Sequence, residues 1–234
     1  MLETRQVYVI PGWGFSCDVF KMLISECLNI IPLNYFDMLE LNFDLIAINL
    51  AQRVSNNAIV MGWSFGGMIG IKMAAMFPEK IKKLILISSQ PRFLSAPNWR
   101  AIDPDVRDGF IDGLKYHYKK QVMKFISISG YPDSNLSSKE FLNNCFIHSN
   151  NEYLLQLLRM LFEVDLRKEY QSLQQDVLHL INNKDAVIKQ YTEQLIGLNP
   201  NVKIVCFKHA GHAGFLANNA AYRDAIGSFI DDRS

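Results

Sequence analysis

The stretch "IVMGWSFGGMIGIKMA", Ile59–Ala74, places one serine between an apolar run and a run of small and apolar residues. The apolar run Ala58–Met61 is typical of a buried strand. The segment Met68–Phe77 has the composition of a helix, and the proline that follows would end it. The stretch therefore predicts a strand, a sharp turn that carries the serine, and a helix.

The serine at this turn is Ser64, in the pattern G-x-S-x-G formed with Gly62 and Gly66. Glycine at both flanking positions permits a turn in which larger side chains would collide. Such a turn lifts the hydroxyl out of the sheet, and the N-terminus of the next helix favours a developing negative charge. Ser64 is therefore a candidate nucleophile. The alternative is a small-residue turn whose hydroxyl is merely hydrogen-bonded.

Further strands and helices alternate along the chain, which favours a mostly parallel central sheet covered by helices on both faces. We expect core segments 1–90 and 176–234, and a helical lid at 91–175 inserted between them in a single overall domain. Strands are expected at 6–10, 29–33, 58–61, 81–89, 177–181 and 202–207, and helices at 45–54, 68–77, 105–126 and 218–230. Pro32 makes the second strand a short or edge strand.

A nucleophilic serine needs a histidine base, and His212 is the strongest of the five histidines. It follows the last strand, and Gly211 and Gly214 let its loop turn back toward the serine. His209 lies nearer the end of the strand. The other three histidines are less suitable because they lie in the helical middle or inside a strand, at His117, His148 and His179.

The base in turn needs a carboxylate, which should follow the preceding strand. Asp185 lies in a polar loop just past that strand. Its alternative role is a helix N-cap. Asp165, in "VDLR", is the second candidate, whereas Asp176 lies at the wrong end of the strand.

An oxyanion needs two backbone donors. The amide of Phe65, directly after the serine, should be one. The loop "PGWGF" after the first strand should supply the other, because Gly12 and Gly14 let the loop approach a substrate closely. We therefore expect the second donor to be the amide of Trp13, whose indole would wall the acyl pocket or simply cap the core.

The composition excludes several function classes. The net charge of +1 gives no overall field for nucleic acid. The cysteines, Cys17, Cys27, Cys145 and Cys206, are scattered without a CxxC pair, which argues against a zinc site and a disulfide framework. We expect no metal and no cofactor. No signal peptide and no membrane span are visible, so we expect a cytoplasmic protein. We also expect a monomer.

Several motifs together resemble one family, the pimeloyl-[acyl-carrier protein] methyl ester esterases of biotin synthesis, within the α/β-hydrolase superfamily. The resemblance covers nearly the whole chain. Its motifs are "GWG" at 12–14, "GWSFGG" at 62–67, "PEKIKKLILISSQPRF" at 78–93, "IDPDVRDGF" at 102–110, "VDLR" at 164–167 and "HAGFLANNAA" at 212–221. The chain departs from the family pattern at Pro11, where histidine is usual, and in "INNKDAVI", which lacks the glycine common before the acid.

The resemblance implies an α/β-hydrolase fold and hydrolysis of the methyl ester on a pimeloyl chain carried by acyl carrier protein. It makes Ser64 the nucleophile, Asp185 the acid and His212 the base. It places Trp13 and Phe65 at the ester. It also places the segment "FISIS" against the acyl chain, with residues Phe125, Ile126, Ser127, Ile128 and Ser129.

The carrier protein is acidic, so its partner should present a local basic face. Lys119, Lys120 and Lys124 are the candidates, and an ordinary solvated helix surface is the alternative. Two other functions use the same scaffold: a general short-chain esterase or carbon–carbon bond hydrolase, and a non-catalytic binding module.

Overall fold

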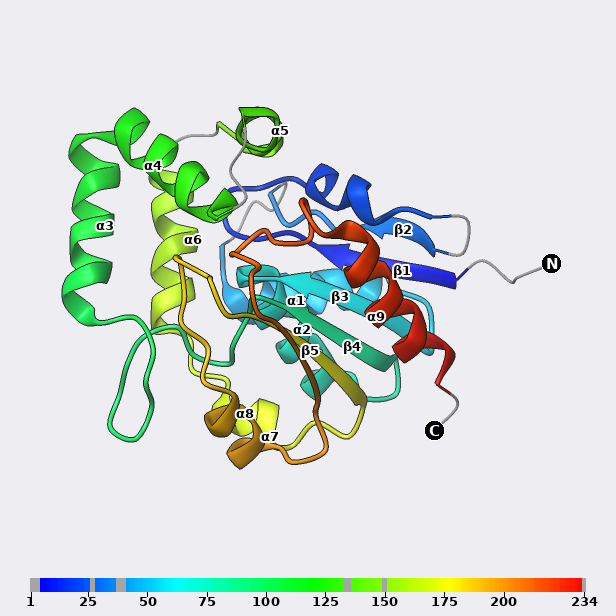
Figure 1. The fold of residues 1–234 in the computed structure, drawn as a ribbon. Coiled ribbons are helices and arrows are strands. Elements are labelled where there is room, and N and C mark those ends of the chain that lie inside the picture. The colour runs from blue at the N-terminus through cyan, green and yellow to red at the C-terminus, as the bar shows by residue number, and fades with distance from the viewer. Residues whose placement is uncertain (1–4, 26–27, 37–40, 133–135, 149–150, 233–234) are drawn as a thin grey trace.

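In the computed structural model, which describes residues 5–25, 28–36, 41–132, 136–148 and 151–232, six strands form one sheet. All neighbouring strands are parallel, in the order β2-β1-β3-β4-β5-β6 (Figure 1). The strands are β1 (Arg5–Ile10), β2 (Leu28–Pro32), β3 (Ala58–Trp63), β4 (Ile81–Ile87), β5 (Asp176–Asn182) and β6 (Lys203–Phe207). The parallel sheet expected from the alternating pattern is confirmed.

The central strands are apolar along almost their whole length because helices cover both faces of the sheet. In β4, every residue except Lys82 is buried. The strand β2 lies at the edge, as Pro32 predicted, since proline lacks the N–H that a central strand needs. Because all strands run the same way, the loops after β1, β3, β4, β5 and β6 meet at the carboxyl-end edge of the sheet, where the strands terminate.

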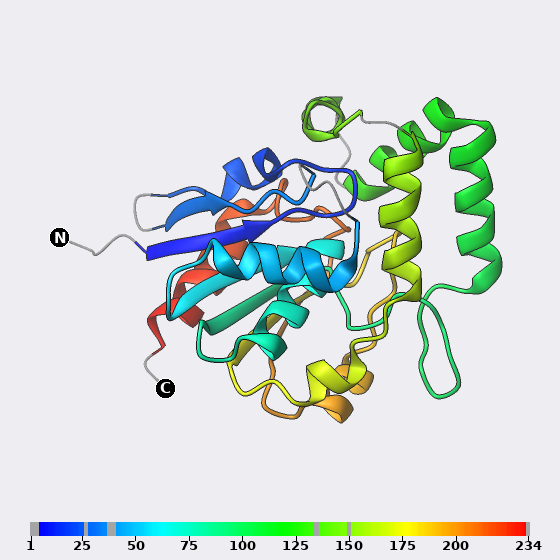
Figure 2. The ribbon, with the colours of Figure 1, turned by 180° about the vertical axis from the view of Figure 1, so that it is seen from behind.

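The two faces of the sheet carry different helices (Figures 1 and 2). Helices α1 and α2 cover one face, and α9 with the short 3-10 helix η1 covers the other. The helices outside the insertion are η1 (Cys17–Leu23), α1 (Phe43–Gln52), α2 (Phe65–Met76), α7 (Arg167–Gln171), α8 (Thr192–Leu198) and α9 (Asn219–Asp231). Helix α2 has buried residues on every side, which fits its place between the sheet and α1.

The buried Lys83 attaches α9 to the sheet. Its ammonium donates to the carbonyl oxygens of Phe229 and Asp232 at 2.9 and 2.8 Å, at the end of α9. It also forms an ion pair with Asp176 at 3.4 Å. A cation at a helix C-terminus satisfies carbonyls that have no partner inside the helix.

Between β4 and β5 the described residues form five helices, and the four that precede α7 lie beyond the carboxyl ends of the strands (Figure 1). We call residues 104–163 the helical insertion. Its helices are α3 (Pro104–Tyr116), α4 (Tyr118–Gly130), α5 (Leu136–Cys145) and α6 (Asn151–Glu163). None of the helices in the described ranges is long and apolar enough to cross a membrane.

The single helix predicted over 105–126 is wrong, because the chain turns a corner between α3 and α4. His117 leaves the helical region, with φ −141° and ψ 44°. Its amide donates to Gly113 and its carbonyl accepts from Gln121, so one residue ends α3 and begins α4. A side chain at Gly113 would collide with that of Gln121. The glycine therefore lets the two helices pack closely.

The cysteines in the described chain are free thiols. Cys17 and Cys145 are buried, and burial raises the pKa of these thiols to about 12 and about 11. Cys206 is exposed, and Cys27 lies outside the described residues. Cys17 and Cys145 thus behave as small buried side chains rather than as reactive thiolates.

Candidate active site

Ser64 lies at the turn between β3 and α2, with φ 54° and ψ −120°. A non-glycine residue rarely adopts such a conformation, so the surrounding bonds must hold it. The amide of Ser64 donates to Ile87 at 2.9 Å, and the Ser89 hydroxyl donates to the Ser64 carbonyl at 2.7 Å. The turn is therefore fixed against the end of β4.

Three glycines around Ser64 allow this turn because each lies against another part of the chain. A side chain at Gly62 would collide with the backbone of Gly66, and one at Gly66 would collide with the Ile10 carbonyl. A side chain at Gly67 would meet the Ser89 hydroxymethyl group. These contacts explain the glycines of the G-x-S-x-G pattern and of the position after it.

His212 and Asp185 form a buried pair at the same edge of the sheet. The distance between His212 Nδ1 and Asp185 Oδ2 is 2.7 Å, and each side chain is 1% exposed. The other carboxylate oxygen, Oδ1, accepts from the amides of Val187 and Ile188 at 2.8 and 2.9 Å. Asp185 is therefore not a helix N-cap, because the next helix, α8, begins only at Thr192; its carboxylate caps a turn and also contacts the histidine.

This pair determines the tautomer of His212. An ionised carboxylate only accepts, so Nδ1 carries a proton, and in the neutral imidazole the lone pair is then on Nε2. His212 Nε2 is buried and has no hydrogen-bond partner among the described residues. An imidazole held in this way presents a basic nitrogen that can take a proton from a neighbouring hydroxyl.

The peptide that joins His212 to Ala213 is hydrogen-bonded at both its carbonyl and its amide. Trp63 donates its indole N–H to the His212 carbonyl at 2.9 Å, and its ring lies 5.3 Å from the imidazole. The amide of Ala213 donates to the Ser129 carbonyl in α4 at 2.9 Å. The loop of His212 is therefore bonded both to β3 and to the helical insertion.

The remaining acid and histidine candidates lie in other surroundings. Partial burial alone would raise the pKa of Asp165, but hydrogen bonds from Arg167 and Arg92 outweigh it and lower the pKa to about 2. Asp176 pairs with Lys83 near the opposite edge of the sheet, and His209 is exposed. Exposed His117 forms the corner between α3 and α4, and His148 packs against Phe146.

His179, inside β5, is fully buried and belongs to a separate network. Its Nε2 donates to the Ser89 carbonyl at 2.6 Å, and Tyr170 donates to its Nδ1 at 3.2 Å. Burial lowers the pKa of His179 to about 4, so the ring is neutral near pH 7. His179 is thus the structural imidazole that its place in a strand predicted.

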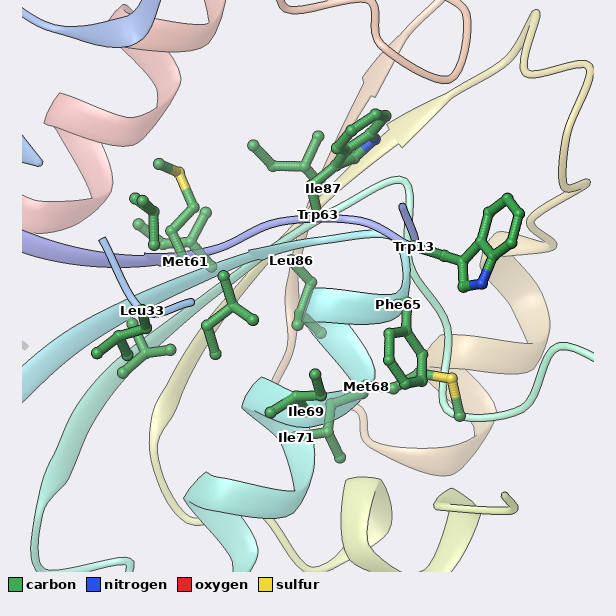
Figure 3. Packing of buried hydrophobic residues seen from close by; sticks show 14 of the residues in the cluster. Trp13, Leu33, Met61, Trp63, Phe65, Met68, Ile69, Ile71, Leu86 and Ile87 are labelled. Atoms are coloured by element: carbon green, nitrogen blue, oxygen red, sulfur yellow. The ribbon is translucent and has the colours of Figure 1, made fainter. Parts of the chain in front are cut away.

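Trp13 and Phe65, whose amides are the predicted oxyanion donors, both lie near Ser64. Phe65 is the first residue of α2, where an amide has no partner inside the helix. A Cβ atom built on Gly12 would lie 3.3 Å from the Ser64 Cβ, so the loop after β1 passes directly beside the serine. Figure 3 shows Trp13 and Phe65 at this end of β3.

The Trp13 side chain is fixed to the insertion. Its indole N–H donates to the Leu154 carbonyl in α6 at 2.8 Å, and its ring meets Phe110, Phe125 and Phe146 edge-on. The Trp13 indole is therefore both a core aromatic and a wall of the cavity described next, so the two interpretations of this residue are compatible.

An apolar cavity of about 110 Å³ opens at Ser64 between the sheet and the insertion. Its walls are Trp13, Ser64, Phe93, Ile102, Val106, Phe110, Phe125, Ile128, Leu158, Leu161, Phe162, Ala186 and Val187. Of the predicted segment, Phe125 and Ile128 line it, whereas Ile126, Ser127 and Ser129 do not. Sequence reasoning missed the α6 residues, although the strong apolar stripe of α6 was a usable signal.

Lys119, Lys120 and Lys124 project from α4 into solvent. None of the three forms an ion pair with another described residue. They lie on the insertion, on the helix that also supplies Phe125 and Ile128 to the cavity.

Comparison with known proteins supports the resemblance stated from the motifs. Residues 50–218 match the sequence model described as the alpha/beta hydrolase fold. Pimeloyl-[acyl-carrier protein] methyl ester esterases from Vibrio cholerae and Wigglesworthia glossinidia brevipalpis are 26% and 27% identical to this chain. Each alignment covers 94% of this chain and 92% of the relative.

Solved structures show the same fold at lower identity. A bromoperoxidase from Bacillus anthracis aligns with a TM-score of 0.87 and 16% identity, over 98% of this chain and 92% of its own. The esterase EaEST from Exiguobacterium antarcticum aligns with a TM-score of 0.84 and 18% identity, over 99% and 94%. These likenesses bear on the fold alone.

Proposed function

Because the chain belongs to the alpha/beta hydrolase fold family, we propose that it is a carboxylic ester hydrolase with Ser64 as nucleophile, His212 as base and Asp185 as the orienting acid. The observation that carries the proposal is the buried Asp185–His212 pair, whose free Nε2 belongs to the sheet edge where Ser64 lines an apolar cavity. Curated relatives named as esterases support the same reaction class.

The proposed reaction has two halves. His212 Nε2 takes the hydroxyl proton of Ser64 while the Oγ atom of Ser64 attacks the ester carbonyl carbon. The amides of Trp13 and Phe65 stabilise the oxyanion that forms. The imidazolium then gives the proton to the leaving alcohol, which leaves an acyl-serine. Water, activated by the same imidazole, cleaves the acyl-serine to the free acid and restores Ser64.

Labelling with a fluorophosphonate tests the nucleophile. The probe should attach covalently to Ser64 in the wild-type protein and leave Ser64→Ala unlabelled, and p-nitrophenyl ester hydrolysis should disappear with the label. Ser172→Ala is the matched control, since it removes an exposed serine hydroxyl beside α7 and leaves the turn at Ser64 intact. Labelling that persists in Ser64→Ala, or its absence from the wild type, contradicts the proposal.

The finer proposal is that the substrate is the methyl ester of a pimeloyl chain on acyl carrier protein, hydrolysed for biotin synthesis. The relatives carrying that name align over nearly the whole chain. The apolar lining suits methylene groups, each of which contributes about 0.8 kcal/mol when fully buried.

Incubation with the carrier-bound methyl ester tests this substrate. Free carboxylate and methanol should form with the wild-type protein and not with Ser64→Ala. Complementation of a biotin auxotroph that lacks this esterase gives the corresponding test in cells. Fast hydrolysis of p-nitrophenyl esters together with an intact carrier-bound ester would instead indicate a general short-chain esterase.

We also propose that Lys119, Lys120 and Lys124 dock the acidic carrier protein. Reversing charge in Lys120→Glu/Lys124→Glu should raise KM for the carrier-bound ester about tenfold at low salt and leave p-nitrophenyl ester hydrolysis unchanged. Lys82→Glu/Lys203→Glu is the control, because these lysines lie at the amino ends of β4 and β6. An equal rise in KM in both variants would show that the effect comes from the overall charge of the protein, and it would contradict docking at α4.

A further inference from the structure

Asn182 ends β5 and lies buried three residues before Asp185, with a relative exposure of 3%. Its carboxamide joins three other parts of the chain. The Nδ2 group donates to the Gly211 carbonyl at 2.6 Å and to the Ser88 hydroxyl at 2.8 Å. The Oδ1 atom accepts from the Tyr222 hydroxyl of α9.

The orientation of this carboxamide follows from its neighbours. A carbonyl oxygen can only accept, so the group facing Gly211 must be the amide nitrogen. The oxygen then faces Tyr222, whose hydroxyl can donate. Both the Nδ2 group and the Oδ1 atom of Asn182 thus have hydrogen-bond partners, and rotating the carboxamide by 180° would break these bonds.

The Gly211 carbonyl belongs to the peptide that joins Gly211 to His212. Fixing this oxygen fixes the plane of that peptide, and hence the direction in which the imidazole leaves the backbone. The peptide on the other side of His212 is held by Trp63 and Ser129. A side chain at Gly211 would collide with the Tyr131 carbonyl of the insertion, so the loop has little room to shift.

We propose that Asn182 is a positioning residue for His212, which it holds through the Gly211–His212 peptide at the proposed nucleophile. The inference rests on the function proposed above. It assigns Asn182 no contact with substrate. Its role complements that of Asp185, since Asp185 fixes the imidazole at Nδ1 and Asn182 fixes the backbone from which the imidazole projects.

The test uses the two tasks of His212. As a base it serves every ester, but as an acid it matters most when the leaving group is a poor one. A methoxide must receive a proton on leaving, whereas p-nitrophenolate leaves without one. A displaced imidazole should therefore slow a methyl ester more than a p-nitrophenyl ester of the same acid.

The experiment compares kcat/KM for methyl butyrate and p-nitrophenyl butyrate in wild-type protein and Asn182→Ala, per site titrated with a fluorophosphonate. We expect a loss of roughly ten- to a hundredfold for the methyl ester and a clearly smaller loss for the p-nitrophenyl ester. Tyr222→Phe is the control, because it removes the bond to Oδ1 and leaves the Nδ2 bond to Gly211 in place, so it should keep the wild-type ratio of the two rates.

If Asn182→Ala lowers kcat/KM by the same factor for both esters, the ratio of the two values is unchanged and the positioning role is overturned, since general damage to the site lowers both alike. The same ratio change in Tyr222→Phe also overturns it. If Asn182→Ala does not fold, Asn182→Ser carries the test with a smaller expected change, because its hydroxyl can donate to one oxygen. Absence of wild-type activity on both esters would instead refute the proposed function.

Discussion

The turn between β3 and α2, which we call the elbow, depends on single residues around Ser64. The positive φ of Ser64 is maintained by backbone bonds and by Ser89, and the glycines around it leave no room for a methyl group. The strain is local and is stabilised by the strands on either side. Changes at these glycines therefore test how tightly the elbow is built.

Gly66→Ala should lower the free energy of unfolding by about 3 kcal/mol or more, because its methyl group would meet the backbone carbonyls of Ile10 and Pro11. Gly227→Ala, in α9, is the control. Its new methyl group meets nothing within 4 Å, so it should stabilise by about 0.5–1 kcal/mol. Urea unfolding of both variants gives the two values, and similar stabilities would contradict the packing argument.

Asp185→Asn should reduce kcat for a p-nitrophenyl ester by about 10³- to 10⁴-fold, because an amide nitrogen facing Nδ1 favours the wrong tautomer of His212. Asp165→Asn is the matched change at the other acid candidate. Its partners are Arg92 and Arg167 rather than His212, so kcat should remain within about twofold of wild type. The reverse pattern would move the acid role to Asp165.

Much of the candidate site could be predicted at this scale, but its supports could not. Ser64, Asp185 and His212 each follow a strand, so the edge of a parallel sheet is where they would meet. The bond from Trp63 to the His212 carbonyl joins residues 149 positions apart, and that from Asn182 to Gly211 joins residues 29 apart. No local pattern encodes such contacts.

At the scale of elements, strands were more predictable than helix ends. Buried parallel strands are short apolar runs, which the sequence displays directly. Helix α2 begins at Phe65 rather than at Met68, because Gly66 and Gly67 are needed for close packing despite their low helix propensity. The corner at His117 was missed because the apolar spacing continues across it.

The strand β5 carries a pH-sensitive element in His179. Its pKa is about 4 in the folded protein and 6.5 in a free chain, so the unfolded state binds a proton that the folded state excludes. Stability from this residue is complete above pH 6.5 and falls as the pH drops toward 4, by roughly 3 kcal/mol in all. His179→Gln should flatten this dependence in urea unfolding between pH 4.5 and 7.5. An unchanged slope would contradict the assignment.

At the scale of the whole molecule, the insertion and the sheet enclose the cavity together. The sheet edge supplies Ser64 and Trp13, and the insertion supplies Phe110, Phe125 and Ile128. Two layers that are distant in the sequence therefore form the walls of the cavity. The sequence predicted an insertion over this edge, but not which of its faces would line the cavity, because that depends on the corner at His117.

Ile128→Trp should fill part of the cavity and lower kcat/KM for p-nitrophenyl hexanoate about tenfold, while p-nitrophenyl acetate changes less than about threefold. Met123→Trp, on the exposed side of the same helix, adds an indole outside the cavity and should leave the preference unchanged. A uniform loss on both esters would place the acyl chain elsewhere.

The attachment of α9 through Lys83 and Tyr222 bears on when a newly made chain can become active. The ribosome makes the elbow early and the histidine loop late, and at ordinary translation speeds the interval is on the order of 10 seconds. During that interval the nascent chain carries the proposed nucleophile without its base. Under the proposed mechanism, hydrolysis can begin only after β6 and α9 have docked, so an ester that meets the unfinished polypeptide should remain intact.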